Sequence, residues 1–252
     1  MSELKLYDLC KKLRLSQNFV EMAMVCEGET HQEYLVELLT RELKNRDVSR
    51  VTKLINTAGF YTIKSINDFR FDEVTLPSGL SKESLLTLDF IREKKNVIMY
   101  GRTGTGKTML STALGVLACQ QNMTVKFFRT ASLINQLSEA KTNGTLGLIH
   151  KKLKKASLII LDEWGYVPYD REGAQLLFDF LSEIHEQKSV ILNTNLEFSR
   201  WANILYDEQM TAALIGRLTH HCHLLLFPGE NNRLRESSIN ELYGSIKRNG
   251  DE

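Results

Sequence analysis

The eight residues at positions 101–108 constrain the fold of this chain more than any other stretch. They read Gly-Arg-Thr-Gly-Thr-Gly-Lys-Thr, which is the spacing of a phosphate-binding loop. An apolar run at 97–100 precedes the loop, and a helical pattern at 109–119 follows it. A strand, a glycine-rich turn and a helix in this order surround an anion with backbone N–H groups and the positive end of the helix dipole. The segment therefore predicts a nucleotide site at the end of a buried strand.

The residue types in this loop have distinct chemical tasks. Lys107 is expected to bridge the β- and γ-phosphates of ATP, and the Thr108 hydroxyl is expected to bind Mg²⁺. The competing interpretation is a flexible Gly/Thr turn, which the flanking strand and helix disfavour. The candidate nucleotide-binding residues of the loop are Gly101, Arg102, Thr103, Gly104, Thr105, Gly106, Lys107, Thr108 and Met109.

Two adjacent carboxylates follow a second apolar run, at 158–161. Neighbouring side chains on a strand diverge, so Asp162 and Glu163 are expected to have different tasks. Asp162 would bind Mg²⁺, whereas Glu163 would orient and polarise the attacking water as the general base. A solvated acidic turn is the alternative, and the phosphate loop in the same chain favours the catalytic interpretation.

Two further residues are candidates for completing a hydrolytic site. Asn195 follows an apolar run at 190–192, where an amide could contact the γ-phosphate or the water, although such residues are also common in turns. Arg217 is the candidate for a guanidinium inserted in trans, from a neighbouring copy, to neutralise charge on the transferred phosphoryl group. Its alternative is an ordinary arginine on a helix surface. The predicted catalytic set is Glu163, Lys107, Asn195 and Arg217.

The wider pattern predicts an α/β fold with a parallel sheet flanked by helices, because apolar runs alternate with helical stretches. Strands are expected at 97–100, 125–128, 158–161, 190–192 and 224–227. The first part of the chain has a helical pattern instead, and the stretch at 61–80 loses it. We therefore predict a small all-helical module at 1–64 and a P-loop ATPase domain at 65–252.

The helical module is expected to contain three helices. The second begins at Thr30, whose hydroxyl caps the helix while Glu33 reaches back to it. A third, short helix ends at Gly59, a residue that readily takes the left-handed conformation. The second helix is expected to bury Leu35, Leu38, Leu39 and Leu43.

Charge and hydropathy limit the partners of the chain. Its 252 residues include 32 basic and 31 acidic side chains, for a net charge of +1, so DNA binding would need a local basic patch. No apolar run approaches the roughly 18 residues of a membrane span, so we expect a soluble, cytoplasmic protein without a membrane partner. The leading candidate for DNA contact is the cluster of Lys151, Lys152, Lys154 and Lys155. The alternative is that these lysines form a solvated helix face.

The cysteines and histidines offer little support for a metal site. Four cysteines lie far apart without a CxxC pair, which favours free thiols over disulfides or a zinc ribbon. Zinc is disfavoured at residues 220–223, because adjacent residues on a strand alternate faces and no second cluster supplies the remaining ligands. That segment reads His220, His221, Cys222 and His223.

Taken together, these segments resemble the IstB family of AAA+ transposition helper ATPases, relatives of the DnaC-type helicase loaders. The resemblance spans nearly the whole chain and rests on residues 101–108, 161–165 and 66–71 and on the early helical stretches 6–15 and 33–46. Asn195 matches the sensor position of the family. Arg217 matches the arginine of a segment that usually reads Asp-Arg-Leu, with Gly216 in place of the aspartate. Arg233, a further candidate nucleotide-binding residue, ends a Gly-Glu-Asn-Asn-Arg segment where the family tends to read Gly-x-Ser-Tyr-Arg.

The resemblance implies functions that the residues alone do not. These are ATP-dependent self-association into a ring or spiral on duplex DNA, cooperation with an integrase-type transposase of the same insertion sequence, and a core without a helical lid. The helical module would be an adaptor. The nearest alternative is a DnaC-like loader of a replicative helicase. A small-metabolite kinase and a nucleotide-gated scaffold that barely hydrolyses ATP are the alternatives from other classes.

Overall fold

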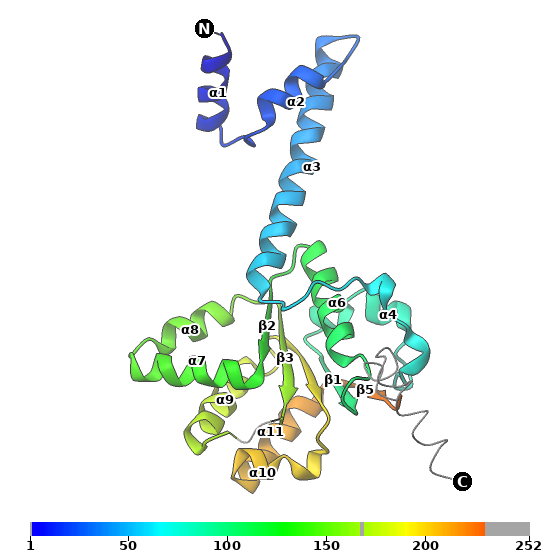
Figure 1. Ribbon diagram of the computed structural model, residues 1–252, viewed down its shortest axis with the longest axis vertical. Helices are drawn as coiled ribbons and strands as arrows, with labels where there is room; N and C mark the ends of the chain where they lie inside the picture. The colour runs from blue at the N-terminus through cyan, green and yellow to red at the C-terminus, as the bar shows by residue number, and fades with distance from the viewer. Residues whose placement is uncertain (1, 167–168, 230–252) are drawn as a thin grey trace, which may run out of the picture. The chain divides into compact units, whose positions relative to one another are not determined.

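The computed structural model describes residues 2–166 and 169–229, without the side chains of residues 2–4 (Figure 1). Contacts divide the chain into two compact units, residues 1–54 and 55–252. The predicted domain limits of 1–64 and 65–252 stay a prediction. No helix among the described residues is long and apolar enough to cross a membrane.

The first unit contains α1 (Ser2–Lys12), α2 (Phe19–Val25) and most of α3 (His31–Ala58). A buried polar contact holds its parts together. The Glu42 carboxylate accepts hydrogen bonds from the backbone N–H of Ser16 (3.0 Å), from the Ser16 hydroxyl and from Arg46 Nε (2.7 Å). Burial alone would raise the pKa of Glu42, but these hydrogen bonds from Ser16 and Arg46 lower it. The small apolar core beside this contact comprises Cys10, Phe19, Val20, Cys26 and Leu38.

The predicted start of the second helix is confirmed, but its predicted end is wrong. Thr30 Oγ1 accepts from the Glu33 N–H (3.2 Å), and the Glu33 carboxylate accepts from the Thr30 N–H (3.1 Å). The helix then continues as α3 without a break to Ala58, where Gly59 follows at φ +90°. The predicted second and third helices are therefore one helix. The polar stretch at 44–50 contains neither glycine nor proline, so it forms a solvated helix turn and not a break.

The predicted burial along this helix is correct for one leucine only. Leu38 is buried, whereas Leu35, Leu39 and Leu43 are more than half exposed. A repeat of apolar residues identifies a helix face, but it does not say whether that face is covered within the same chain.

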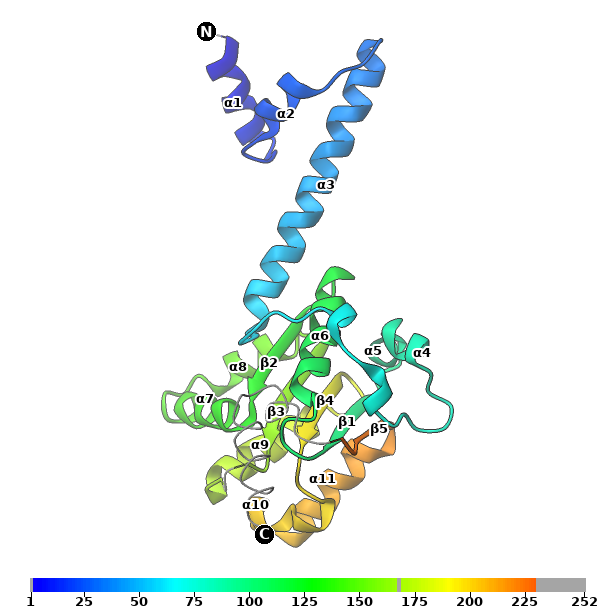
Figure 2. The same ribbon diagram turned by 45° about the vertical axis from the view of Figure 1, so that its right-hand side comes forward.

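The second unit is built on a five-stranded parallel sheet with the strand order β2-β3-β4-β1-β5 (Figure 2). All five predicted strands are confirmed, with ends extended by one to three residues. Their bounds are β1 Asn96–Gly101, β2 Val125–Arg129, β3 Leu158–Trp164, β4 Ser189–Thr194 and β5 Cys222–Phe227. β1, the strand that enters the phosphate loop, lies between β4 and β5.

Helices cover both faces of the sheet (Figure 2). On one face α6 packs against the strands, and the small Gly115 lets Ile160 and the Phe60 ring approach it closely. On the other face Ile159 and Leu161 contribute to a large core shared with α7, α9, α10 and α11. The helices are α4 Lys82–Leu86, α5 Asp89–Arg92, α6 Lys107–Gln120, α7 Thr130–Thr142, α8 Leu146–Leu153, α9 Arg171–Ile184, α10 Ala202–Leu205 and α11 Glu208–His220, with short 3-10 turns at Ile66–Asp68, Phe71–Glu73 and Phe198–Arg200.

The second unit has the α/β architecture that the sequence predicts, a parallel sheet flanked by helices on both faces. Within the described residues, which end at Gly229, no helical lid follows β5. All four cysteines are free thiols, as the sequence predicts. Burial raises the pKa of the Cys119 thiol to about 11.

Candidate functional site

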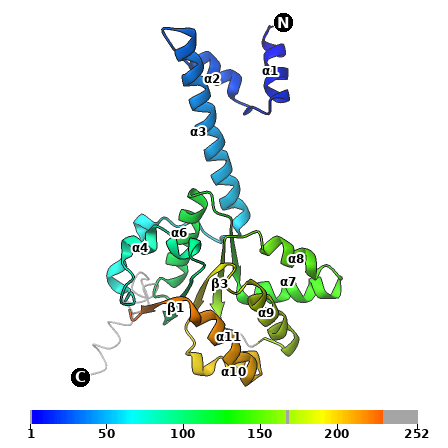
Figure 3. The ribbon, with the colours of Figure 1, turned by 180° about the vertical axis from the view of Figure 1, so that it is seen from behind.

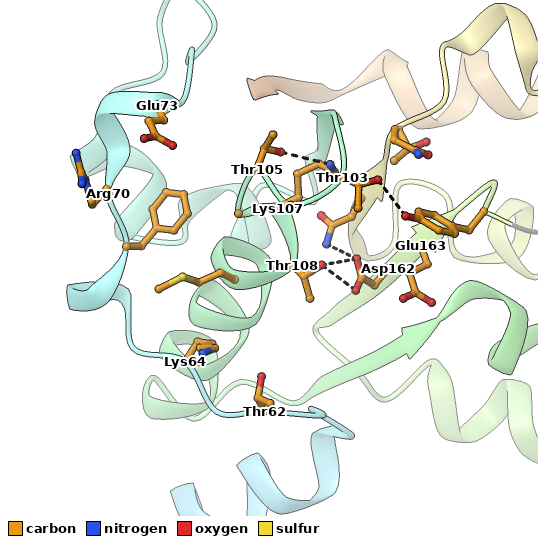
Figure 4. Close-up of a pocket in the computed structure, with 18 of the residues that line it drawn as sticks. Thr62, Lys64, Arg70, Glu73, Thr103, Thr105, Lys107, Thr108, Asp162 and Glu163 are labelled. Atoms are coloured by element: carbon orange, nitrogen blue, oxygen red, sulfur yellow. Dashed lines mark hydrogen bonds between the residues drawn. The ribbon is translucent and has the colours of Figure 1, made fainter. Parts of the chain in front are cut away.

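A pocket of about 620 Å³ lies where β1, β3 and β4 end (Figure 4). Parallel strands deliver their carboxyl ends to the same edge of a sheet, which is where such folds bind ligands. The lining includes Thr103 to Met109 of the loop, both predicted acids, the end of β4 and part of the segment at 62–73. Residues predicted from separate motifs thus share one pocket. From the predicted set it contains Thr103, Gly104, Thr105, Gly106, Lys107, Thr108, Met109, Asp162, Glu163 and Asn195.

The phosphate loop has the conformation that its glycines permit. Gly104 and Gly106 have φ values of +83° and +98°, in the left-handed region that glycine adopts without steric cost. The Thr105 hydroxyl closes the turn by donating to the carbonyl of Arg102 (2.8 Å). Lys107 donates to the carbonyls of Gly101 and Arg102, both at 2.6 Å, so its ammonium lies inside the loop. The predicted lysine is therefore beside the place where the loop would hold phosphate.

Asp162 lies at the centre of a hydrogen-bond network that joins β3 and β4 to α6 and α7. The Thr108 hydroxyl donates to its two carboxylate oxygens at 3.1 and 3.0 Å. Asn193, on β4, donates through Nδ2 to Asp162 Oδ1 (2.9 Å) and to Ser111 Oγ of α6 (2.7 Å). The hydroxyl of Thr130, at the start of α7, binds the Asp162 carbonyl (2.9 Å). The carboxylate is almost fully buried, so these donors fix its direction.

The residues of this network fit a magnesium ion. Ligand oxygens at the usual Mg²⁺ distance in an octahedron stand about 2.9 Å apart. The Thr108 hydroxyl and the Asp162 carboxylate are separated by nearly that distance, at 3.0 Å, and both are hard oxygen ligands. Thr108 and Asp162 are therefore the residues that would hold the ion between the chain and a nucleotide.

Glu163 is set apart from Asp162 by the backbone. It has φ +57°, uncommon for a residue with a side chain, and the pairing of β3 with β4 is irregular there. The next turn is held by Tyr169, whose hydroxyl accepts from the Gly165 N–H (3.1 Å). The Glu163 carboxylate lies in the pocket lining, 3.4 Å from Arg129 Nε, and is half-exposed. The two adjacent acids consequently have different surroundings, one buried and hydrogen-bonded and the other open to solvent.

The segment at 62–73 forms the other wall of the pocket (Figure 4). The Phe69 ring covers the loop so closely that a side chain at Gly106 would stand 3.2 Å from it. Phe69 also packs edge-on against Phe71 at 5.0 Å between ring centroids. Lys64 and Arg70 bring basic groups to the same wall. An aromatic surface beside a phosphate loop suits a nucleotide base.

Asn195, Arg217 and Arg233 differ in where they lie. Asn195 lines the pocket, but it is exposed and follows the end of β4. Arg217 lies on α11 outside the pocket lining, where it donates to Ser182 Oγ (2.5 Å) and its guanidinium is 5.1 Å from the centre of the Phe178 ring. Arg233 lies outside the described residues.

Among the pocket residues that are not in the predicted set, Asn193 and Tyr166 form hydrogen bonds with predicted residues. Asn193 makes the contacts to Asp162 described above, and the Tyr166 hydroxyl is 2.9 Å from Thr103 Oγ1 of the loop. Asn193 directly follows the predicted strand at 190–192 and lies two residues before Asn195, on the same side of an extended chain, so the sequence pattern did not separate the two amides. Tyr166 carried no signal in the sequence, because its contact joins residues distant in sequence.

Comparison with known proteins identifies the family. The profile described as IstB-like ATP binding protein matches residues 2–240. A Geobacillus stearothermophilus protein, named for ATP binding and for insertion sequence IS5376, is 30% identical over 245 residues, or 94% of this chain and 96% of that protein. A Pseudomonas aeruginosa protein, named in the same way for insertion sequence IS21, is 34% identical over 209 residues, or 82% and 78% of the two chains.

A solved structure gives the same fold at low sequence identity. The crystal structure of DnaI superimposes with a TM-score of 0.52 and 17% identity, covering 71% of this chain and 92% of that one. That likeness concerns the fold alone, whereas the profile and the two relatives cover most of the sequence. The chain belongs to the family of IstB-like ATP-binding proteins.

Proposed function

We propose that this protein hydrolyses ATP with Mg²⁺ and, as an assembly on duplex DNA, delivers target DNA to the transposase of its insertion sequence. The main support is the contact of Asp162 with Thr108 and Asn193 beside the phosphate loop, with Glu163 in the same pocket. The relatives named for insertion sequences support the biological setting.

The proposed reaction divides its tasks among residues already placed. The loop N–H groups and Lys107 hold the β- and γ-phosphates, and Thr108 and Asp162 would hold Mg²⁺, which would supply positive charge beside these phosphates. Glu163 accepts a proton from the water that attacks the γ-phosphorus, so the bond from that phosphorus to the bridging oxygen breaks and ADP leaves. Asn195 orients the water or the γ-phosphate. Arg217 of a neighbouring copy adds positive charge to the transferred phosphoryl group, which agrees with its place outside the pocket of its own chain.

ATP turnover measured against protein concentration and DNA tests this function. Because Arg217 acts only on another copy, the rate per chain should rise as copies associate, and duplex DNA should increase it further. A rate per chain that stays constant from dilute to concentrated protein and ignores DNA would leave an ATP-binding scaffold as the better description.

The lysine cluster near α8 should supply part of the DNA contact. Lys151, Lys152 and Lys155 are exposed, whereas the Lys154 ammonium forms an ion pair with Glu183 and lowers the pKa of that acid. Alanine at the three exposed lysines should flatten the slope of log affinity against log salt by about 0.9 for each phosphate that is no longer neutralised. Fluorescence anisotropy with duplexes of unrelated sequence measures the slope.

Lys154→Ala is the matched control for that experiment, because its charge is already paired with Glu183. It should change the salt slope much less than the triple variant. If the triple variant binds DNA with an unchanged slope while its ATP hydrolysis without DNA is normal, the DNA surface lies elsewhere.

Removal of residues 1–54 should abolish transposase binding and leave a folded ATPase. The pocket residues all lie beyond residue 60, whereas the first unit carries the exposed Leu35, Leu39 and Leu43 that suit a protein partner. Pull-down with the transposase and ATP binding would be measured on the same preparation. A deletion extended through residue 64 is the comparison, and it should be unstable because Ala58 is buried and Phe60 packs against Phe127. Full transposase binding by the shorter deletion would contradict an adaptor role.

A DnaC-like helicase loader remains the alternative. The likeness to DnaI shows only a shared fold, and the relatives named for insertion sequences favour transposition. The same pull-down with a replicative helicase in place of the transposase separates the two.

A further inference from the structure

A group of metal-ligand side chains gathers at the edge of the sheet opposite the nucleotide pocket. Glu186 lies in the turn between α9 and β4, whereas His220 ends α11 and His221 directly precedes β5. One ligand atom from each of the three side chains can be chosen so that all lie within 4.8 Å of one another. The distant turn therefore supplies one carboxylate ligand beside the two histidines.

The spacing of these atoms suits a small tetrahedral ion. In tetrahedral zinc with nitrogen and oxygen ligands, neighbouring ligand atoms stand about 3.4 Å apart. His220 Nδ1 is 3.5 Å from Glu186 Oε1, and the ring centroids of His220 and His221 are 4.2 Å apart. All three side chains are exposed, so small rotations can bring the ligands to a common centre and water can fill the fourth position.

The backbone that carries these ligands is held in place by a buried residue, Asn96 of β1. Its N–H donates to the carbonyl of His221 (2.7 Å), and its Nδ2 donates to the carbonyl of Leu218 on α11 (3.0 Å). Its Oδ1 accepts from the N–H of Val190, next to the turn of Glu186 (3.0 Å). One side chain thus fixes both turns relative to each other, which lowers the entropy cost of gathering their ligands around an ion.

We propose that Glu186, His220 and His221 bind a zinc ion that pins the turn after α9 to the end of α11. These two helices pack together (Figure 3), and Arg217 of α11 donates to Ser182 of α9 one turn before His220. The ion would therefore clamp the helix pair that positions Arg217. Imidazole nitrogen selects zinc over Mg²⁺ and Ca²⁺, so the site is distinct in chemistry from the oxygen ligands Thr108 and Asp162.

Calorimetric titration of the untagged, nucleotide-free chain with Zn²⁺ tests the site. One ion per chain should bind, and His220→Gln, His221→Gln and Glu186→Gln should each weaken binding by more than about tenfold, because loss of a ligand costs at least as much as loss of its outer hydrogen bond. His223→Gln is the matched control, since that histidine lies on β5 outside the group, and it should bind zinc as the parent chain does.

Thermal unfolding gives a second, independent measurement. Zinc at about a hundredfold excess over its Kd should raise the unfolding midpoint of the parent chain by on the order of 5 °C, and Ca²⁺ should not. The rise should vanish in His220→Gln. One zinc per two chains would show an ion bridging copies, and an equal loss of binding in His223→Gln would show non-specific histidine binding. Either result, or no saturable binding, would overturn the proposal.

Discussion

Glu163→Gln is expected to stop ATP hydrolysis without weakening ATP binding. The change removes the carboxylate that accepts the proton of water but keeps the size of the side chain, so kcat should fall by about 10²–10⁴-fold. Glu163 is separated from the Thr108 and Asp162 contact by its own backbone conformation, so the magnesium ligands should be undisturbed. Single-turnover hydrolysis and equilibrium binding of ATP measure the two quantities separately.

Lys107→Ala should produce the opposite defect. Its ammonium lies within the phosphate loop, and loss of charge-assisted hydrogen bonds to phosphate should weaken ATP binding by about ten- to hundredfold. Glu172→Gln, at an exposed acid of α9, is the control for the first variant and should leave both quantities unchanged. If Glu163→Gln and Lys107→Ala lose ATP affinity equally, Glu163 is not the general base.

Arg217→Ala should also reduce turnover strongly, by about 10³–10⁵-fold if it behaves as other arginines inserted in trans do. The defect should spare ATP binding, because Arg217 lies outside the pocket of its own chain. Its contact with Ser182 provides a control, since Ser182→Ala removes that hydrogen bond and leaves the guanidinium. Ser182→Ala should therefore keep most of the activity.

Mixing two inactive variants gives the decisive measurement for an arginine in trans. A Glu163→Gln chain has a pocket that cannot hydrolyse ATP but an intact Arg217, and an Arg217→Ala chain has the reverse. Hydrolysis should reappear in the mixture, because one copy supplies the arginine and its neighbour supplies the pocket. If the mixture stays as inactive as each variant alone, while both variants assemble on DNA, Arg217 has a structural role through its contact with Ser182 of α9.

The sequence predicted what depends on local pattern. The strands, the loop and the cap at Thr30 follow from apolar runs and short-range hydrogen bonds, and the structure contains all of them. The single helix α3 was predicted as two, because a polar stretch alone does not reveal whether a helix stops. The exposure of Leu35 depends on what covers a helix face, which periodicity does not specify.

The missed residues depend on contacts between distant parts of the chain. Asn193 was passed over for Asn195 because only the pairing of β3 with β4 shows which amide faces Asp162. The sequence also does not predict the group of Glu186, His220 and His221, because Glu186 is distant from the histidines in sequence and only the fold brings it near them. Alternation along a strand places Asn193 and Asn195 on the same face, so only the three-dimensional structure separates these two amides or shows that Glu186 lies near the histidines.

The strand order determines when this chain can acquire a nucleotide site during synthesis. β2 and β3 are neighbours in both sequence and sheet, so they can pair while the ribosome is still making the rest. β1 is made before them, but its sheet neighbours are β4 and β5, the last strands to emerge. Such distant pairings form slowly and leave apolar edges exposed in the meantime. We therefore expect the phosphate loop to take its final shape late, so that ATP binds only to chains in which all five strands have paired.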